Sequence, residues 1–161
     1  MVSIDEYLTT SFPDLDCEYD DGEIVERSVP SYSHGKTQKK FLTFFDALSK
    51  KWPLFPTVET RLRVSAIRAR VPDVSVYSPH EPADTDLTLA PHIVVEVLSP
   101  DDRMLDVLEK LSEYRAMGIP HVWVVDPQSQ LLYEYSGSLN PVPSLRLPDF
   151  GIELTAAEIF D

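Results

Sequence analysis

The alternation of apolar and polar positions along the chain predicts an α/β fold. Residues 92–98 and 121–126 are almost continuously apolar, which is typical of central strands covered on both faces. Residues 57–64 and 71–77 alternate in the manner of half-buried strands, and residues 131–135 predict a further, more exposed strand. We therefore expect these segments to form one mixed sheet.

Helical and turn signals fall between the predicted strands. Helices are predicted at residues 3–9, 33–50 and 101–117, with Gly118 as the C-cap of the last one. Asp20-Asp21-Gly22 separates two extended runs, residues 17–19 and 23–27, and indicates a β-hairpin. Because the helix at 101–117 joins two buried strands, we expect a right-handed βαβ crossover there. The fold class is therefore α/β, a single domain (residues 1–161) in which helices flank a mixed sheet.

Length and composition narrow the class of protein. A chain of 161 residues, 43% of them hydrophobic, can bury a core without disulfide or metal staples. Neither an apolar stretch of about 18 residues nor a basic segment followed by an apolar one is found, so we expect no membrane span and no secretory signal. Cys17, the one cysteine, rules out an intramolecular disulfide, and cytoplasmic residence is the simplest interpretation. We expect Cys17 to be buried and inert.

The distribution of charge matters more than its sum. The net charge of −13 argues against binding to nucleic acid, whose affinity comes mostly from phosphate neutralisation. Residues 36–70, however, hold nine Lys or Arg and two acids, a local charge of +7 that leaves −20 for the rest of the chain. This segment predicts either a basic face that attracts DNA or a solvated charged helix followed by a basic loop.

Glu96 is the unusual residue of the pattern, since it places a carboxylate in the middle of a strand that should be buried. Burying an isolated carboxylate is costly unless it pairs with a cation or binds a metal. Asp73 lies on the preceding strand, and the two carboxylates converge if the strands are neighbours. Mg²⁺ suits such a pair because it takes one or two carboxylates and retains several waters. In the alternative, Glu96 turns to solvent or pairs with an arginine, and Asp73 merely follows a turn.

Short motifs extend over nearly the whole chain. They are Glu18-Tyr19-Asp20-Asp21-Gly22-Glu23, His34, Pro72-Asp73, Val94-Val95-Glu96-Val97-Leu98-Ser99-Pro100, the helical set Asp106, Lys110 and Tyr114, Gly118-Ile119-Pro120, Trp123-Val124-Val125-Asp126-Pro127, and Leu147-Pro148-Asp149-Phe150 as a C-terminal strand. Each motif alone is weakly specific. Their order and spacing together resemble the Uma family, which is classed with restriction endonucleases in the PD-(D/E)XK nuclease superfamily.

The resemblance implies a restriction-endonuclease-like fold and a DNA phosphodiesterase site that uses Mg²⁺, with Mn²⁺ as a substitute. It implies that Asp73, Glu96 and the Val97 carbonyl hold the metal and that Glu18 assists the metal or orients water. The alternative for Glu18 is an exposed charge of the hairpin. The superfamily places a lysine two residues after this glutamate, where the chain has Leu98. Contacts to nucleic acid are expected from four residues: His34, Lys36, Arg61 and Arg63. A homodimer is compatible with the sequence but is not indicated by it.

Lys110 is the candidate for the displaced lysine. On a helical wheel it falls at the edge of the apolar arc, near Tyr114, so its stem can lie along the core while its ammonium reaches the sheet. The alternative is an ion pair with Asp106, four residues earlier. For the whole protein the alternative is a non-catalytic binding or assembly module, which Leu98 and the acidic composition favour. His34 has its own alternative, a solvated position at the start of a helix.

Overall fold

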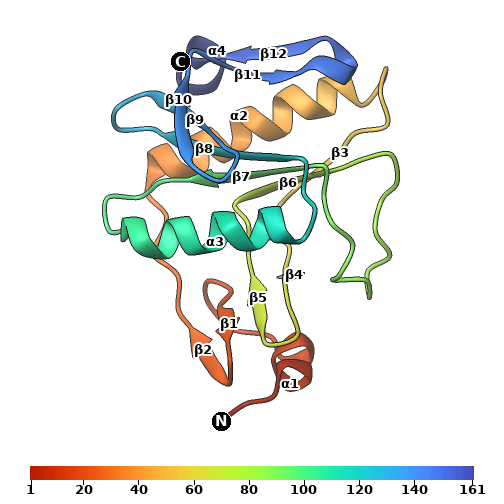
Figure 1. Cartoon of the computed structure of the whole chain (residues 1–161), viewed down its shortest axis with the longest axis vertical. Helices are drawn as coiled ribbons and strands as arrows, with labels where there is room; N and C mark the ends of the chain where they lie inside the picture. Colours follow the sequence, from red (N-terminus) through yellow and green to blue (C-terminus); the bar gives the residue numbers. More distant parts are fainter.

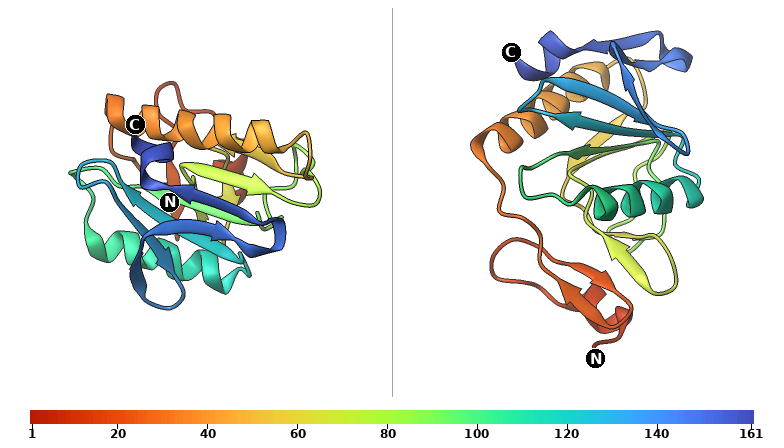
Figure 2. Two further views of the ribbon diagram at one scale, coloured as in Figure 1. Left: turned by 90° about the horizontal axis from the view of Figure 1, so that it is seen from above. Right: turned by 60° about the vertical axis from the view of Figure 1, so that its left-hand side comes forward.

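A six-stranded mixed sheet between two long helices forms the centre of the computed structural model, which describes residues 1–161 (Figure 1). Seen from above, α2 (Tyr32–Leu48) covers one face of the sheet and α3 (Met104–Ala116) covers the other (Figure 2). The strand order is β10-β9-β8-β7-β6-β3. The strands are β3 (Phe55–Val58), β6 (Val74–Tyr77), β7 (Ile93–Val97), β8 (His121–Asp126), β9 (Leu131–Tyr135) and β10 (Leu139–Val142).

Strand β7 is buried on both faces, as its apolar sequence predicted. Ile93, Val95 and Val97 belong to the core that includes Phe41 and Phe45 of α2. Val94 belongs to a second core, formed with side chains of α3 that include Leu111 and Tyr114. Because side chains alternate along a strand, Glu96 lies on the same face as Val94, toward α3.

The neighbours of β7 confirm the two predicted pairings. Strand β6 runs antiparallel to β7, with Val74 opposite Val95, so the predicted strands at 71–77 and 92–98 are adjacent. Strand β8 runs parallel to β7, with Val95 opposite Trp123, and α3 forms the connection between them. Strand β9 is antiparallel to β8, and β10, which the sequence did not predict, pairs with β9.

A smaller sheet of order β2-β1-β5-β4 lies beyond the main one, toward the N-terminus (Figure 1). It contains β1 (Glu18–Asp20), β2 (Glu23–Val25), β4 (Leu62–Arg63) and β5 (Arg68–Arg70), and α1 (Ile4–Thr9) packs beside it. The predicted hairpin is confirmed: Asp21 (φ 43°) and Gly22 (φ 97°) form its turn, and two successive positive φ angles favour glycine there.

The expectation of one sheet, and of one strand at 57–64, was wrong. Glu59 has a φ of 51°, which ends β3 in the main sheet, and the chain resumes as β4 in the small sheet. A positive φ is costly for a residue with a side chain, so surrounding contacts hold Glu59 in this conformation. The same change of sheet divides residues 68–77 into β5 and β6.

The C-terminal segment forms a separate hairpin against α2. Its elements are β11 (Ser144–Leu147), the 3-10 turn η1 (Pro148–Phe150), β12 (Ile152–Thr155) and α4 (Ala156–Phe160). Leu147-Pro148-Asp149-Phe150 is therefore the end of β11 and the turn after it, not the predicted strand, because Pro148 starts the 3-10 turn. None of the helices combines the length and the apolar character that crossing a bilayer requires.

Candidate active site

Asp73 and Glu96 occupy facing positions on adjacent strands. The register that places Val74 opposite Val95 places Asp73, one residue before β6, opposite Glu96. The Glu96 side chain lies toward Tyr114 of α3, and both residues are buried, with exposures of 4% for Asp73 and 8% for Glu96. The predicted convergence of the two carboxylates is therefore what the strand register produces, and Glu96 does not turn to solvent.

Hydrogen bonds fix each carboxylate from a different side. The Val97 amide donates to Asp73 Oδ2 at 2.7 Å, and the Tyr114 hydroxyl donates to Glu96 Oε1 at 2.6 Å. The remaining oxygen of Asp73, Oδ1, lies 3.2 Å from Arg27 Nη2 and 3.3 Å from His34 Nε2. One oxygen of Asp73 is thus held firmly by backbone, while the other has two longer contacts with basic side chains.

The two carboxylates have opposite pKa shifts. Burial raises the pKa of Glu96 well above its usual range, and the neighbouring charge of Asp73 raises it further. Burial also acts to raise the pKa of Asp73, but attraction to His34 and hydrogen bonds from Glu96 and the Val97 amide lower it below its usual value. In the absence of a cation, burial and like charge therefore favour the protonated form of Glu96, while the donors around Asp73 favour its carboxylate form.

Lys110 enters this site from α3, with Glu18 as its partner. Its ammonium lies 2.8 Å from Glu18 Oε1, and only 22% of its side chain is exposed. Burial lowers the pKa of Lys110, but the charges of Glu96 and Glu18 raise it by more, so the side chain is an ammonium. It forms no ion pair with Asp106, which contacts Arg103 at 3.9 Å instead. The alternative of an Asp106–Lys110 pair is therefore excluded.

Glu18 reaches the site from β1 of the small sheet. It is 2% exposed, and its second oxygen, Oε2, accepts a hydrogen bond of 2.8 Å from the Val71 amide. Arg70 Nη1 lies 3.8 Å from Oε1 of the same carboxylate. Glu18 is thus a fixed acceptor between the small sheet and Lys110, not an exposed charge of the hairpin.

Ion pairs join the small sheet to α3 along the same side. Arg70 of β5 contacts Glu113 through two nitrogens, and Arg68 contacts Glu109 of α3 as well as Asp20 of β1. These contacts explain why two of the basic residues in the segment 36–70 do not form a free positive face. They also hold β1, and with it Glu18, against the helix that carries Lys110.

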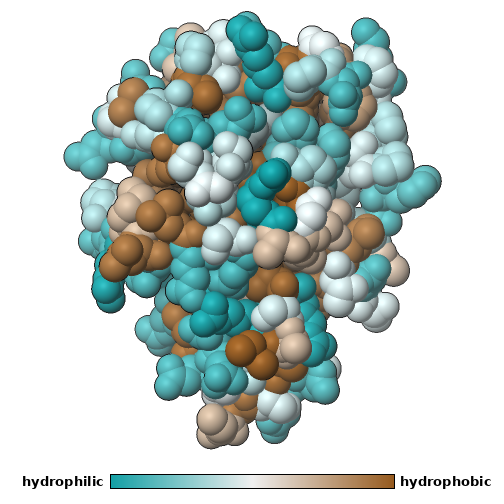
Figure 3. All heavy atoms as spheres, in the orientation of Figure 1, coloured by the Kyte–Doolittle hydropathy of each residue, from teal (hydrophilic) through white to brown (hydrophobic).

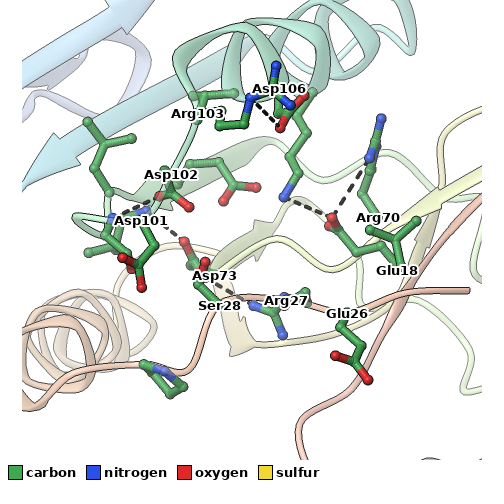
Figure 4. A pocket seen from close by; sticks show the side chains of 18 of the residues that line it. Glu18, Glu26, Arg27, Ser28, Arg70, Asp73, Asp101, Asp102, Arg103 and Asp106 are labelled. Carbon is green, nitrogen blue, oxygen red and sulfur yellow. Dashed lines mark hydrogen bonds and ion pairs between the residues drawn. The ribbon is translucent and has the colours of Figure 1, made fainter.

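A cavity of about 310 Å³ connects these side chains and opens between the small sheet, the linker before α2 and the start of α3. Figure 4 shows Asp73, Glu18, Arg27 and Asp102 arranged around it. Ten acids and four bases line the cavity: Glu18, Asp20, Glu26, Glu59, Asp73, Glu96, Asp101, Asp102, Asp106 and Glu109, with Arg27, Arg70, Arg103 and Lys110. The surroundings of the two carboxylates are therefore strongly acidic, which favours a cation as ligand.

The predicted nucleic-acid contacts separate in the structure. His34 lines the cavity and is buried, at 5% exposure, so it is not a solvated residue at the start of α2. Lys36 is exposed and contacts the Phe160 carbonyl at 3.4 Å, which places it by the C-terminal helix. Arg63 turns its guanidinium to the nearby Ser65 and Ala66 carbonyls. Neither Lys36 nor Arg63 lines the cavity.

Arg61 is a structural residue, which argues against the predicted contact with nucleic acid. Its guanidinium forms two hydrogen bonds with Asp16, at 2.8 and 2.7 Å, and one each with the Tyr7 and Thr10 carbonyls, both at 2.7 Å. It also stacks on the Tyr7 ring, 4.4 Å from the centroid. Nearly all of its donors are used to hold the N-terminal segment, and few remain for a phosphate. Charge sign alone gave no signal of these partners.

The donor set fits a hard divalent cation. The site offers two carboxylates, and the structure contains no group of three or more His, Cys, Asp or Glu side chains placed to hold a metal ion. Mg²⁺ needs only one or two carboxylates, because waters complete its shell. Arg27 and Glu59, which the sequence did not single out, also line the cavity; both were placed within predicted extended runs, and in the structure both lie just outside the strands.

The comparisons with known proteins agree with this architecture. A family model named Uma2, with the description "Putative restriction endonuclease", matches residues 4–155. A crystal structure of a putative nuclease belonging to DUF820 from Anabaena variabilis has a TM-score of 0.84 to the chain at 22% sequence identity, covering 99% of this chain and 98% of the other. No curated protein matches significantly. The mixed sheet flanked by helices is thus the restriction-endonuclease-like fold, and the protein belongs to the Uma2 family.

Proposed function

We propose that the protein is a metal-dependent nuclease that hydrolyses phosphodiester bonds of DNA. The observation that carries the proposal is the buried pair of Asp73 and Glu96, which face each other on adjacent strands beside the ammonium of Lys110. The family's description and the Anabaena protein, itself described as a putative nuclease, support a nucleic acid as substrate. Restriction enzymes act on DNA, which favours DNA over RNA.

Mg²⁺, or Mn²⁺ in its place, is the expected cofactor. Asp73, Glu96 and the Val97 carbonyl would hold it, and all three residues line the cavity. When bound, such an ion polarises a phosphate oxygen and lowers the pKa of a coordinated water. Both carboxylates are already held in place, because the Val97 amide donates to Asp73 and the Tyr114 hydroxyl donates to Glu96.

Lys110 supplies the positive charge that Leu98 cannot. Hydrolysis adds negative charge near an already anionic phosphate, and a fixed ammonium there stabilises the transition state. The ammonium is anchored by Glu18, which is itself fixed by the Val71 amide. Glu18 therefore acts on the reaction chiefly by positioning Lys110, and its carboxylate is also placed to orient a water molecule in the cavity.

The acidic lining of the cavity favours one rival, a non-catalytic binding module with the same fold. Ten acids against four bases repel a polyanion unless a cation is bound. Leu98, in the position where the superfamily usually has a lysine, also favours the binding module. The rival predicts no metal-dependent cleavage under any condition, whereas the nuclease predicts cleavage that requires the metal.

Cleavage of supercoiled plasmid with Mg²⁺ or Mn²⁺ tests the proposal. Wild-type protein should nick the plasmid, a chelator should stop the reaction, and Asp73→Ala should abolish it. Asp149→Ala, which removes an exposed carboxylate outside the cavity, is the matched control and should cleave normally. Cleavage that persists in Asp73→Ala, or that is absent from the wild type with either metal, contradicts the proposed function.

A further inference from the structure

Arg27 places a guanidinium directly on the candidate metal site. Its Nη2 lies 3.2 Å from Asp73 Oδ1 and 3.5 Å from Glu59 Oε1, and its side chain is only 10% exposed. Its Nη1 is buried and has no hydrogen-bond partner. Burial has removed water from this guanidinium, and one of its donors has no replacement partner. A purely structural ion pair would satisfy all the buried donors.

The contact between Arg27 and Asp73 is loose. Charge-assisted hydrogen bonds are usually about 2.7–2.9 Å long, and Oδ1 has contacts of 3.2 Å to Arg27 and 3.3 Å to His34. In contrast, Oδ2 receives the Val97 amide at 2.7 Å. Since the backbone fixes Oδ2, the oxygen that remains for a metal ion is Oδ1, the same oxygen that Arg27 contacts.

The segment that carries Arg27 offers little resistance to movement. Residues 27–30 connect β2 to α2, and none of them forms a hydrogen bond with another backbone group. Glu59 provides a second anion for the guanidinium, so Arg27 can leave Asp73 and remain at the edge of the cavity. Glu59 is held there by a backbone conformation of positive φ, 51°, which is uncommon for a residue with a side chain.

We propose that Arg27 is the internal counter-ion of Asp73, that a divalent cation displaces it from Oδ1, and that the freed guanidinium then binds a phosphate of the nucleic acid. This inference rests on the proposed function and adds a residue to it. It also reconciles the acidic cavity with an anionic substrate. When the metal replaces Arg27 on Asp73, the metal and the freed guanidinium both present positive charge to the substrate. An arginine fork is suited to a phosphate because its donors match two phosphate oxygens.

The test compares the affinity for Mn²⁺ of the wild type, Arg27→Met and Arg146→Met by calorimetry at pH 8. Arg146 is an exposed arginine of the C-terminal hairpin, and its substitution by Met is the matched control. Arg27→Met should bind Mn²⁺ at least about tenfold more tightly than the wild type, since a unit charge about 4 Å away opposes the metal. Damage to the site would lower the affinity, so the direction of the change separates the two roles.

The second part of the test is binding of a short DNA duplex with Ca²⁺ as the metal, so that binding is measured apart from cleavage. Arg27→Met should bind the duplex at least about tenfold more weakly, the scale of one lost charge-assisted phosphate contact, and Arg27→Lys should recover part of the loss. Thermal unfolding confirms that the variants are folded. Unchanged or weaker Mn²⁺ affinity in Arg27→Met, with normal binding by the wild type, overturns this inference alone. Failure of both proteins to bind Mn²⁺ overturns the proposed function as well.

Discussion

Replacing Lys110 by Met removes the ammonium from the site and keeps most of the stem in place. The structure indicates two separate effects. The first is on stability, because Glu18 is 2% exposed and loses a partner at 2.8 Å. The Val71 amide and, more distantly, Arg70 still serve this carboxylate. We therefore expect the free energy of unfolding to fall by about 1–3 kcal/mol, the range for a buried group that keeps part of its hydrogen bonding.

The second effect is on cleavage. Loss of one preorganised electrostatic group typically lowers kcat by about 10²–10³-fold, and we expect Lys110→Met to show a loss of this size. Metal affinity also changes, because a positive charge near Glu96 is removed, so the rate is measured with the metal site saturated. The assay is single-turnover cleavage of a labelled duplex at saturating Mg²⁺, with Lys39→Met as control, since Lys39 is an exposed residue of α2 outside the cavity.

A second substitution separates the two effects. Adding Glu18→Gln to Lys110→Met removes the other charge, so no unpaired buried carboxylate remains and the stability should return toward that of the wild type. Cleavage should stay low in the double variant. Wild-type rates in Lys110→Met, or a loss of rate that disappears when the stability is restored, would show that Lys110 serves the fold and not the reaction.

Three further predictions concern the carboxylate pair and the N-terminal segment. Tyr114→Phe removes a hydrogen bond that lowers the pKa of Glu96. Mn²⁺ affinity near neutral pH should therefore decrease, and the pH dependence of Mn²⁺ affinity should shift to higher pH. An unchanged pH dependence would exclude this positioning role of Tyr114. Because the pKa of Glu96 is raised and a metal requires the carboxylate, Mn²⁺ binding should release protons and become tighter as pH rises. Calorimetry in buffers of different ionisation enthalpy measures the release, and binding without proton release is the contrary result. Arg61→Ala should lower the free energy of unfolding by about 2–4 kcal/mol, because it loses hydrogen bonds and stacking on Tyr7. Arg63→Ala, the control, should change it by less than about 1 kcal/mol. Equal losses in urea unfolding would contradict the role of Arg61 in holding the N-terminal segment.

The sequence predicted that two carboxylates converge because its pattern constrains their positions. A charged residue inside the apolar run of β7 identified Glu96, and the adjacent strand positioned Asp73 opposite it. Periodicity also placed Lys110 on the correct side of α3, where its ammonium reaches Glu18. These predictions used the alternation of side chains within regular elements, which the chain keeps when it folds.

The residues that the sequence did not identify lie where such alternation stops. Arg27 lies on a linker without regular structure, and Glu59 has a positive φ at the point where the chain changes sheets. The extended runs predicted at 23–27 and 57–64 covered both residues and gave no sign of these breaks. The basic face, one of two alternatives for residues 36–70, loses part of its charge for a different reason. Arg61, Arg68 and Arg70 find acidic partners that are distant in sequence, and a count of charge in a window does not contain those partners.

Surface hydrophobicity adds one observation that the sequence pattern left undefined. Met104 and Leu105 at the start of α3 are 49% and 73% exposed, and Tyr32 at the start of α2 is 87% exposed. Figure 3 shows the rest of this face to be mostly hydrophilic, with apolar atoms gathered at the left-hand end of α3. Met104 borders a hollow that shares Leu98, Ser99 and Asp102 with the cavity, so substitutions of Met104 should be kept out of the activity controls.

The most direct measurement is a crystal structure of the protein soaked with Mn²⁺, in which anomalous scattering locates the metal. The account predicts one strong peak between Asp73 and Glu96, about 2 Å from an oxygen of each carboxylate and from the Val97 carbonyl, and no peak at this position in Asp73→Ala. A peak only elsewhere in the cavity, for example on Asp101 and Asp102, or none at all at millimolar Mn²⁺, would contradict the claim that this pair is a metal-dependent catalytic centre.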